Sequence, residues 1–193
     1  MKLIVESGAT KTDFCLLCGK EQVRFRLDGI NLATMSDECI AGVLSKASER
    51  LSEAATPDSV KEIYFYGAGL VSEKVSITSS TSVFSQKLDS LLRKIFASAS
   101  SIEYNSDLMA SARALWGSRP GISVILGTGS NSCLYDGSRI VSNVRPCGFI
   151  IGDFGSGASL GKAFLADYLQ NQMPSEISER FEHDYGMDYQ SIV

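Results

Sequence analysis

The sequence is poor in histidine and offers few candidate metal ligands. His183 is the only histidine among 193 residues, and it lies far along the chain from the single C-x-x-C pair, Cys15 and Cys18. A zinc site needs about four ligands at suitable spacing, so such a site is poorly supported. We expect the five cysteines to be reduced and structural, with Cys39, Cys133 and Cys147 packed as small hydrophobic side chains.

Basic runs and long apolar runs are also missing. A formal net charge of −4 without a basic stretch argues against nucleic acid as a partner. No apolar stretch approaches the length that crosses a membrane, and nothing resembles a signal peptide. We therefore expect a cytoplasmic protein without a membrane partner, long enough for one domain or two small ones.

A strand, a small-residue turn and a second strand occupy residues 3–18. The turn contains Gly8, Thr10 and Thr12, which supply backbone N–H groups and hydroxyls that can bind an anion. Glu6 stands at the end of the first strand, where a metal-bound water could sit. Taken alone, the pattern fits a structural turn better than a functional one.

The chain repeats this pattern at residues 123–142. A second apolar strand enters a turn of glycine, threonine and serine, and a second hairpin follows it. Gly129 then corresponds to Gly8, and Asn131 to Thr10. Two such hairpins in one chain predict two related lobes that face one nucleotide.

Several further segments place polar residues after predicted strands. A third strand at 22–27 precedes Asn31, which is either a turn former or a ligand for a sugar. A helix from Ser36 or Asp37 to about residue 54 leads to a strand at 60–66 and a glycine-rich loop. Ligands gather at such carboxyl ends in open α/β sheets.

Asp107 follows the next strand and opens a helix that Gly117 stops. Residues 72–83, before that strand, predict a polar loop, and an amphipathic helix follows to residue 96. Asp107 is either a helix cap or, at the end of a core strand, also a catalytic base. Two later helices are expected at 159–169 and 176–185.

Six segments, taken in order, resemble the sugar kinase, heat-shock ATPase and actin superfamily. Within it, the chain is similar to the N-acetylglucosamine kinase-like group of the BadF/BadG/BcrA/BcrD ATPase family. The similar segments are 6–12 and 126–131 as phosphate loops, 29–31 and 66–69 on the sugar side, 105–107 as the catalytic segment, and 152–157 as a Gly-Asp-x-Gly-Ser motif. Glu6 replaces the usual aspartate, and Phe154 stands where glutamate is common.

The resemblance implies an α/β fold of the ribonuclease H-like, actin-like ATPase type. A lobe with a mixed sheet is expected over residues 1–118, with its first three strands antiparallel and the later ones parallel. The beginning of a second similar lobe is expected over 119–193. The adenosine-binding segment of the family has no counterpart, so we expect an N-terminal portion or a truncated relative. Such a chain is expected to bind ATP very weakly and to show little or no kinase turnover, while weak sugar binding is retained.

The implied function is phosphorylation of the 6-hydroxyl of N-acetylglucosamine by ATP with Mg²⁺. Asp107 would be the base, and Glu6 with Asp153 would hold Mg²⁺ through water. The remaining implied ligands are the phosphate-binding Gly8, Thr10, Lys11, Thr12, Gly127, Thr128, Gly129 and Ser130, and the sugar-binding Asn31, Gly67, Asn131 and Asp153. The expected partner is a small sugar, and a homodimer is left open.

Two alternatives remain from other classes of function. One is an ATPase activator of a radical dehydratase, in which a cysteine in the segment that begins the second-lobe helix helps to hold an iron–sulfur cluster. Residues 153–158 contain no cysteine. The other is a non-catalytic relative that binds a sugar or a nucleotide.

Overall fold

The computed structural model describes residues 1–8, 10–32, 35–67, 70, 73–75, 83–187 and 189–192. These residues form two compact units, each described here by itself. The first unit contains Met1–Ser123 and Leu134–Val141, and the second contains Val124–Cys133 and Ser142–Val193. The division of the chain at residue 118 into two ribonuclease H-like lobes stays a prediction.

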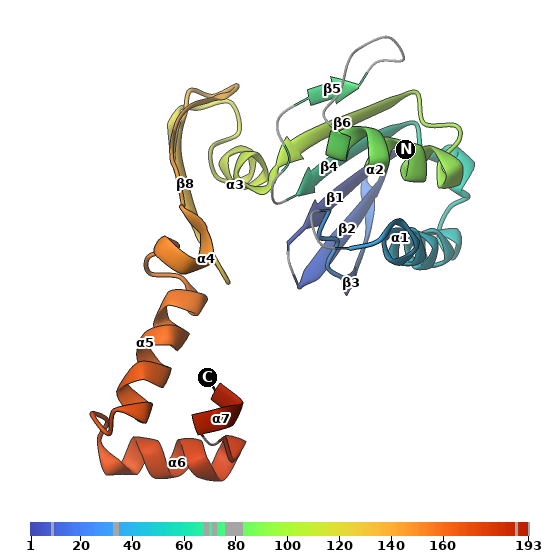
Figure 1. Ribbon diagram of the computed structural model, residues 1–193. Helices are drawn as coiled ribbons and strands as arrows, with labels where there is room; N and C mark the ends of the chain where they lie inside the picture. The colour runs from blue at the N-terminus through green and yellow to red at the C-terminus, as the bar shows by residue number, and fades with distance from the viewer. Residues whose placement is uncertain are drawn as a thin grey trace. The chain divides into compact units, whose positions relative to one another are not determined.

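The first unit is built on a six-stranded mixed sheet in the order β3-β2-β1-β4-β6-β5 (Figure 1). β1 pairs antiparallel with β2 and β2 with β3, whereas β1, β4 and β6 are parallel, as expected. The strands are β1 (Lys2–Ser7), β2 (Lys11–Cys18), β3 (Glu21–Asp28), β4 (Glu62–Gly67), β5 (Glu73–Val75) and β6 (Ser101–Ser106).

The short strand β5 was not expected from the sequence. It lies inside a segment that the composition predicts to be a polar loop, and it pairs antiparallel with β6, so the expectation that all later strands of this lobe are parallel is wrong. Three residues are too few for a period-two pattern to emerge from a serine- and threonine-rich stretch. The segment therefore forms a strand because β6 offers it a pairing partner, and not because its own sequence favours one.

The register of the parallel strands brings their carboxyl ends into one row. Ser7 of β1 pairs with Gly67 of β4, and Gly67 pairs with Ser106 of β6. The antiparallel neighbours continue this edge, because Ser7 also pairs with Thr12 and Lys11 pairs with Asp28. The turn after β1 and the segments after β3, β4 and β6 all leave the sheet at the same edge.

Two helices cover one face of this sheet. Helix α1 (Asp37–Ser52) begins at the cap Ser36, whose Oγ accepts a hydrogen bond from Cys39 N, and it buries Ile40, Val43, Leu44, Ala47 and Leu51. Helix α2 (Val83–Ile95) packs beside α1 and, with it, against the apolar side chains that alternate along β1, β2 and β4. A single hydrophobic core results, as the alternation predicts.

Helix α3 (Asp107–Trp116) packs against β1, β4 and β6. Its Arg113 contacts Tyr66 and Glu103, which alternate with the core residues Phe65 and Tyr104 along their strands. Because successive side chains of a strand point to opposite faces, α3 lies on the face opposite to α1 and α2. A short 3₁₀ helix (Pro57–Ser59) precedes β4.

A three-stranded sheet, β7-β8-β9, follows α3. The turns between its strands are too short for parallel connections, so neighbouring strands run antiparallel. The strands are β7 (Gly121–Leu126), β8 (Ser130–Tyr135) and β9 (Ile140–Val144). The hairpin predicted from the repeated turn is therefore present.

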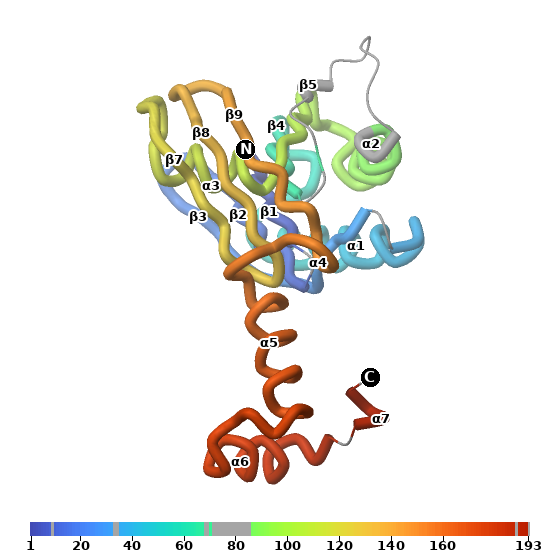
Figure 2. Tube along the Cα trace, turned by 60° about the vertical axis from the view of Figure 1, so that its left-hand side comes forward, coloured from blue at the N-terminus to red at the C-terminus, as the bar shows by residue number. Residues whose placement is uncertain are grey.

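The second unit is helical beyond this sheet. Helix α4 (Gly148–Ile151) precedes α5 (Gly157–Leu169), α6 (Ser175–Tyr185) and α7 (Tyr189–Ile192), and Figure 2 shows the short turn between α5 and α6. Phe181 of α6 packs edge-on against Phe164 and Tyr168 of α5. Among the described residues of this unit, Cys133 is the only buried hydrophobic side chain.

The five cysteines are free thiols, and Cys133 is buried, as expected. Cys39 and Cys147 are exposed, so the expectation that these two pack as small hydrophobic side chains is wrong. In the part of the chain that the structure describes, three or more metal-ligating side chains do not gather at one place. No described helix is long and apolar enough to span a membrane.

Leucine to alanine substitutions on two helices test where the core lies. Leu44 of α1 is fully buried, whereas Leu115 of α3 is 58% exposed. Leu44→Ala should lower the free energy of unfolding by about 2–5 kcal/mol, because a cavity remains. Leu115→Ala should change it by about 0.5 kcal/mol or less. Urea denaturation followed by circular dichroism measures both; equal losses would contradict this core.

Candidate functional site

The carboxyl edge of the first sheet gathers most of the residues that the sequence singles out. Gly8 and Thr10 lie in the turn after β1, Gly67 ends β4, and Asp107 directly follows β6. Asn31 comes shortly after β3, at the same edge. Ligands bind at this edge in open α/β sheets, so the position is suitable for a site.

Ser7 connects two of these segments through a buried hydroxyl group. Its Oγ lies 2.8 Å from Thr12 Oγ1, accepts a hydrogen bond from Ile30 N at 2.9 Å, and donates to Ile30 O at 3.2 Å. The turn after β1 and the segment that carries Asn31 are thereby held together. Ser7 was not among the site residues predicted from the sequence. Its burial could have been predicted, because Ser7 continues the alternation of buried residues along β1.

The predicted phosphate-binding residues of the first turn differ in exposure. Gly8 N donates to Lys11 O at 2.9 Å and closes the turn, and the side chains of Thr10 and Lys11 are exposed. Thr12 is fully buried, so its hydroxyl braces the hairpin through Ser7 and does not face solvent. Ala9, the remaining residue of this turn, lies outside the described residues.

Glu6 is the half-buried carboxylate of the edge. It pairs in register with Asp13 of β2 and Tyr66 of β4. Burial raises the pKa of the Glu6 carboxyl group, and the negative charges of Asp13 and Asp107 raise it further. A cation placed near Glu6 would relieve this unfavourable charge, so the chemistry of the residues fits Mg²⁺, which binds through one or two carboxylates and keeps several waters.

Asp107 is not the cap of its helix. The cap is Ser106, whose Oγ accepts a hydrogen bond from Met109 N at 3.2 Å. Asp107 is instead the first helical residue, and its Oδ1 accepts from Leu108 N at 2.7 Å. The capping alternative is therefore wrong, because the serine before Asp107 satisfies the helix terminus.

Asn31 and Gly67 are held by local contacts. The carbonyl oxygen of Asn31 accepts a hydrogen bond from Met35 N at 2.9 Å, and its backbone N–H points to Met35 Sδ at 3.2 Å. A Cβ at Gly67 would approach Leu70 Cδ1 to 3.2 Å, so the strand end has little room for a side chain. Ala68 and Gly69, which complete the predicted loop, lie outside the described residues.

In the second unit, the turn between β7 and β8 packs on the start of α5. Gly127 O accepts a hydrogen bond from Gly157 N at 2.8 Å, and Thr128 O accepts from Ala158 N at 3.1 Å. Gly127 N donates to Gly129 O at 2.9 Å and closes the turn. The predicted second phosphate loop is thus fixed beside a helix N-terminus.

Asp153 joins this cluster in a strained backbone conformation. Its φ of +55° is unusual for a residue with a side chain, and such outliers concentrate at functional sites. Asp153 N donates to Pro146 O at 2.8 Å, Asp153 O accepts from Ser156 N at 3.0 Å, and Oδ1 accepts from Ser130 N at 3.2 Å. Gly129 lies against the same carboxylate, since a Cβ there would be 3.1 Å from Oδ2.

Asn131 lines a cavity of about 230 Å³ in the second unit. Its Oδ1 accepts hydrogen bonds from Ser132 N and from Asn143 Nδ2, at 2.9 and 2.8 Å. Ser130 and Arg145 also line this cavity, among mostly apolar side chains. The sequence analysis did not name Asn143 and Arg145 as site residues, because neither lies in a recognisable motif. Their polar character and their position shortly before the Gly-Asp segment were the only features that could have indicated them.

Together these features define the class of the protein. The first unit is a ribonuclease H-like α/β lobe with a mixed sheet, and the fold is that of the actin-like ATPases. No family model matches the chain, and no curated protein sequence matches it. Solved structures, by contrast, match over nearly its whole length.

A "putative N-acetylglucosamine kinase" from Porphyromonas gingivalis is 38% identical, with a TM-score of 0.86, and the match covers 100% of this chain and 64% of that one. A second protein of this description, from Chromobacterium violaceum, is 20% identical, with a TM-score of 0.67 over 98% of this chain and 65% of that one. A ROK hexokinase from Thermus thermophilus is 16% identical, with a TM-score of 0.53 over 98% and 71%. The last two show the fold alone.

The raised pKa of Glu6 predicts a pH-dependent effect of Glu6→Gln on stability. The folded-state pKa lies above the ordinary value of 4.5, so Glu6 contributes stability at low pH that is lost as the pH rises through the folded-state pKa. The variant should therefore gain stability relative to the unaltered protein as the pH increases from about 4 to 7. Denaturation at several pH values measures this difference.

Glu62→Gln is the matched control, for which the change in stability with pH should have the opposite sign. Hydrogen bonds from Lys2 and Tyr64 lower the pKa of Glu62, so its contribution is present above the ordinary pKa and is lost on acidification. This variant should lose stability as the pH rises over the same interval. A Glu6→Gln difference that is constant with pH would contradict the predicted environment of Glu6.

Proposed function

We propose that the protein is an ATP-dependent sugar kinase that phosphorylates N-acetylglucosamine at its 6-hydroxyl. We also propose that it belongs to the N-acetylglucosamine kinase-like group of the BadF/BadG/BcrA/BcrD ATPase family. The observation that carries this is the gathering of Asp107, Glu6, Gly8 and Asn31 at one sheet edge. The 38% identity to the Porphyromonas gingivalis protein over the whole chain supports it.

In this proposal, Asp107 accepts the proton of the sugar hydroxyl. Its carboxylate stands at the end of a core strand, and Ser106 provides the helix cap in its place. Asn31 and Gly67 would orient the sugar from the same edge, and Asn131 and Asp153 would contribute from the second unit. Hydrogen bonds to particular hydroxyls give such recognition its selectivity.

The two glycine-containing turns would bind phosphate. Gly8, Thr10 and Lys11 offer backbone N–H groups, a hydroxyl and an ammonium group, and Gly127, Thr128, Gly129 and Ser130 offer a second turn beside α5. Thr12 would act by bracing the first turn. Glu6 and Asp153 are the carboxylates that would hold Mg²⁺ through water. Mg²⁺ bound to ATP neutralises charge that develops on the transferred phosphoryl group.

Isothermal titration of the purified chain separates this function from its alternatives. Binding of N-acetylglucosamine together with sugar-dependent release of ADP supports the kinase. Iron in the purified protein would favour the dehydratase activator. Sugar binding without ADP release is the result expected both of a non-catalytic relative and of a portion of a kinase that binds ATP very weakly. The chain spans 64% of the Porphyromonas protein, so turnover and binding are measured separately.

Asp107→Asn tests the proposed base. The substitution keeps the size of the side chain but removes its ability to accept a proton. In a full-length, active form, kcat should therefore fall by about 10²–10⁴ with little change in ATP affinity. Asp58→Asn is the control, because Asp58 precedes β4 at the opposite edge of the sheet, where it accepts a hydrogen bond from Ser98. Near-normal turnover in Asp107→Asn would show that Asp107 is not the catalytic base.

A further inference from the structure

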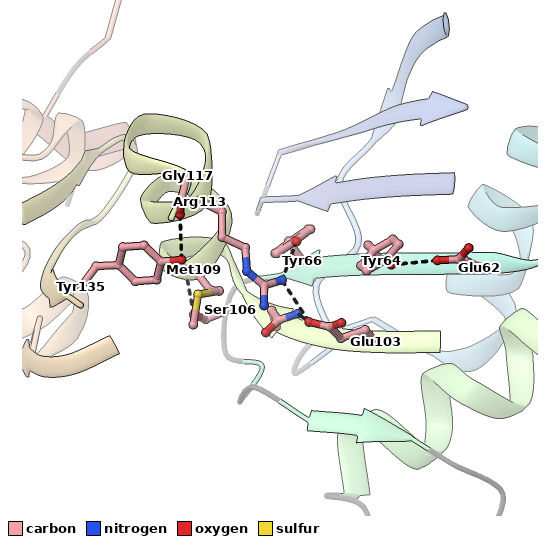
Figure 3. A network of polar contacts seen from close by, with 10 residues as sticks. Glu62, Tyr64, Tyr66, Glu103, Ser106, Met109, Arg113, Gly117 and Tyr135 are labelled. Atoms are coloured by element: carbon pink, nitrogen blue, oxygen red, sulfur yellow. Dashed lines mark hydrogen bonds and ion pairs between the residues drawn. The ribbon is translucent and has the colours of Figure 1, made fainter. Parts of the chain in front are cut away.

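The helix that carries Asp107 is held along its whole length. Ser106 caps its start, and its C-terminal Gly117 O accepts a hydrogen bond from the buried Tyr135 hydroxyl at 3.0 Å. Between these two points, Arg113 forms a third attachment (Figure 3). The first two contacts fix the ends of α3, whereas Arg113 joins its middle to the sheet.

Arg113 lies at the centre of a polar network between α3, β4 and β6. Its Nη1 donates to Tyr66 Oη at 2.8 Å and to Glu103 Oε1 at 2.9 Å. The same Glu103 oxygen accepts from Asn105 Nδ2 at 2.9 Å. The side chains of Arg113 and Glu103 are 35% and 20% exposed, so this pair is less screened than a surface ion pair.

The network includes residues of β4 and β6 that lie next to the strand ends at the candidate site. Tyr66 directly precedes Gly67, and it pairs in register with Glu6 on β1 and with Asn105 on β6. Tyr66 and Asn105 are buried, with 8% and 2% of their surface exposed. The contacts that hold the middle of α3 are therefore made to β6 and to β4, which ends at Gly67 and pairs with the strand that carries Glu6.

The position of Asp107 follows the orientation of α3. β6 ends at Ser106 and α3 begins at Asp107, so no connecting loop absorbs a rotation of the helix. The buried apolar residues Leu108 and Met109 hold α3 on the sheet, but hydrophobic contacts are not directional. The hydrogen bonds of Arg113 are directional and therefore restrict rotation about the helix axis.

We propose that Arg113 is a positioning residue that fixes the rotation of α3, and with it the place of the Asp107 carboxylate, through Tyr66 and Glu103. The inference rests on the proposed function only for the role it gives to Asp107. A displacement of about 1 Å in a reacting group can cost about 10²-fold in rate, so a small rotation would matter for the chemistry.

Arg113→Met compared with Arg93→Met tests this proposal. Arg93 of α2 forms a similar pair with Asp89, with side chains 30% and 19% exposed, but it does not contact α3 in any hydrogen bond or ion pair of the described residues. Both substitutions keep the apolar stem and remove one half-buried ion pair of the first unit. A purely structural role predicts similar consequences for both.

The amide NMR signal of Leu108 reports on Asp107 directly, because Leu108 N–H donates to Asp107 Oδ1 at 2.7 Å. We expect Arg113→Met to shift this signal, Arg113→Lys to restore it in part, and Arg93→Met to leave it unchanged. In a form of the protein that shows turnover, kcat should fall by about tenfold to a hundredfold in Arg113→Met alone, with little change in affinity for N-acetylglucosamine. An unchanged Leu108 signal in Arg113→Met, or the same shift in Arg93→Met, overturns the proposal.

Failure of the proposed function and failure of the Arg113→Met variant to fold can each be distinguished from failure of this proposal. If the unaltered protein binds no sugar, the proposed function fails, while the NMR comparison still decides whether Arg113 positions Asp107. If Arg113→Met does not fold, Tyr66→Phe replaces it, because that substitution removes only the hydroxyl that accepts from Arg113. A Leu108 shift in Tyr66→Phe then supports the network, and its absence overturns it.

Discussion

The parallel alignment of β1, β4 and β6 is the constraint on which the first unit depends. Because Ser7, Gly67 and Ser106 pair across three strands, the segments that follow them leave the sheet together. The alignment is stabilised by one hydrophobic core beneath α1 and α2, where a shift by one residue would turn every core side chain to the other face. Packing on one face of the sheet thus sets the position of polar groups at its edge.

The acidic character of this edge has an energetic cost that neighbouring cations reduce. Glu6 is half-buried, and the negative charges of Asp13 and Asp107 disfavour its ionised form and raise its pKa. Arg26 binds Asp13 through two hydrogen bonds of 2.7 and 3.0 Å, and so offsets part of this repulsion. A half-buried carboxylate with a raised pKa, such as Glu6, is suited to a bound cation or to proton transfer.

The second unit holds its polar loop by local contacts. The β7–β8 turn, Asp153 and the start of α5 are connected through backbone hydrogen bonds that need no large core. The left-handed backbone of Asp153 is maintained by contacts with Pro146, Ser156 and Ser130. Residues kept in such conformations are costly, and their persistence here agrees with the proposed role of Asp153.

The sequence alone determined the elements with a strong period, because local alternation is a direct record of which side chains are buried. It predicted β1 to β4, helix α1 with a cap at Ser36 or Asp37, and the glycine-containing turns. Only the tertiary structure decided that Ser106 caps α3, that the Thr12 hydroxyl is buried on Ser7, and that β5 pairs with β6. It also placed Arg113 against Glu103 and Tyr66. These four outcomes depend on contacts between segments or on the choice between adjacent polar residues. Neither a contact between segments nor such a choice produces a periodic pattern in the sequence, so neither could be predicted from it.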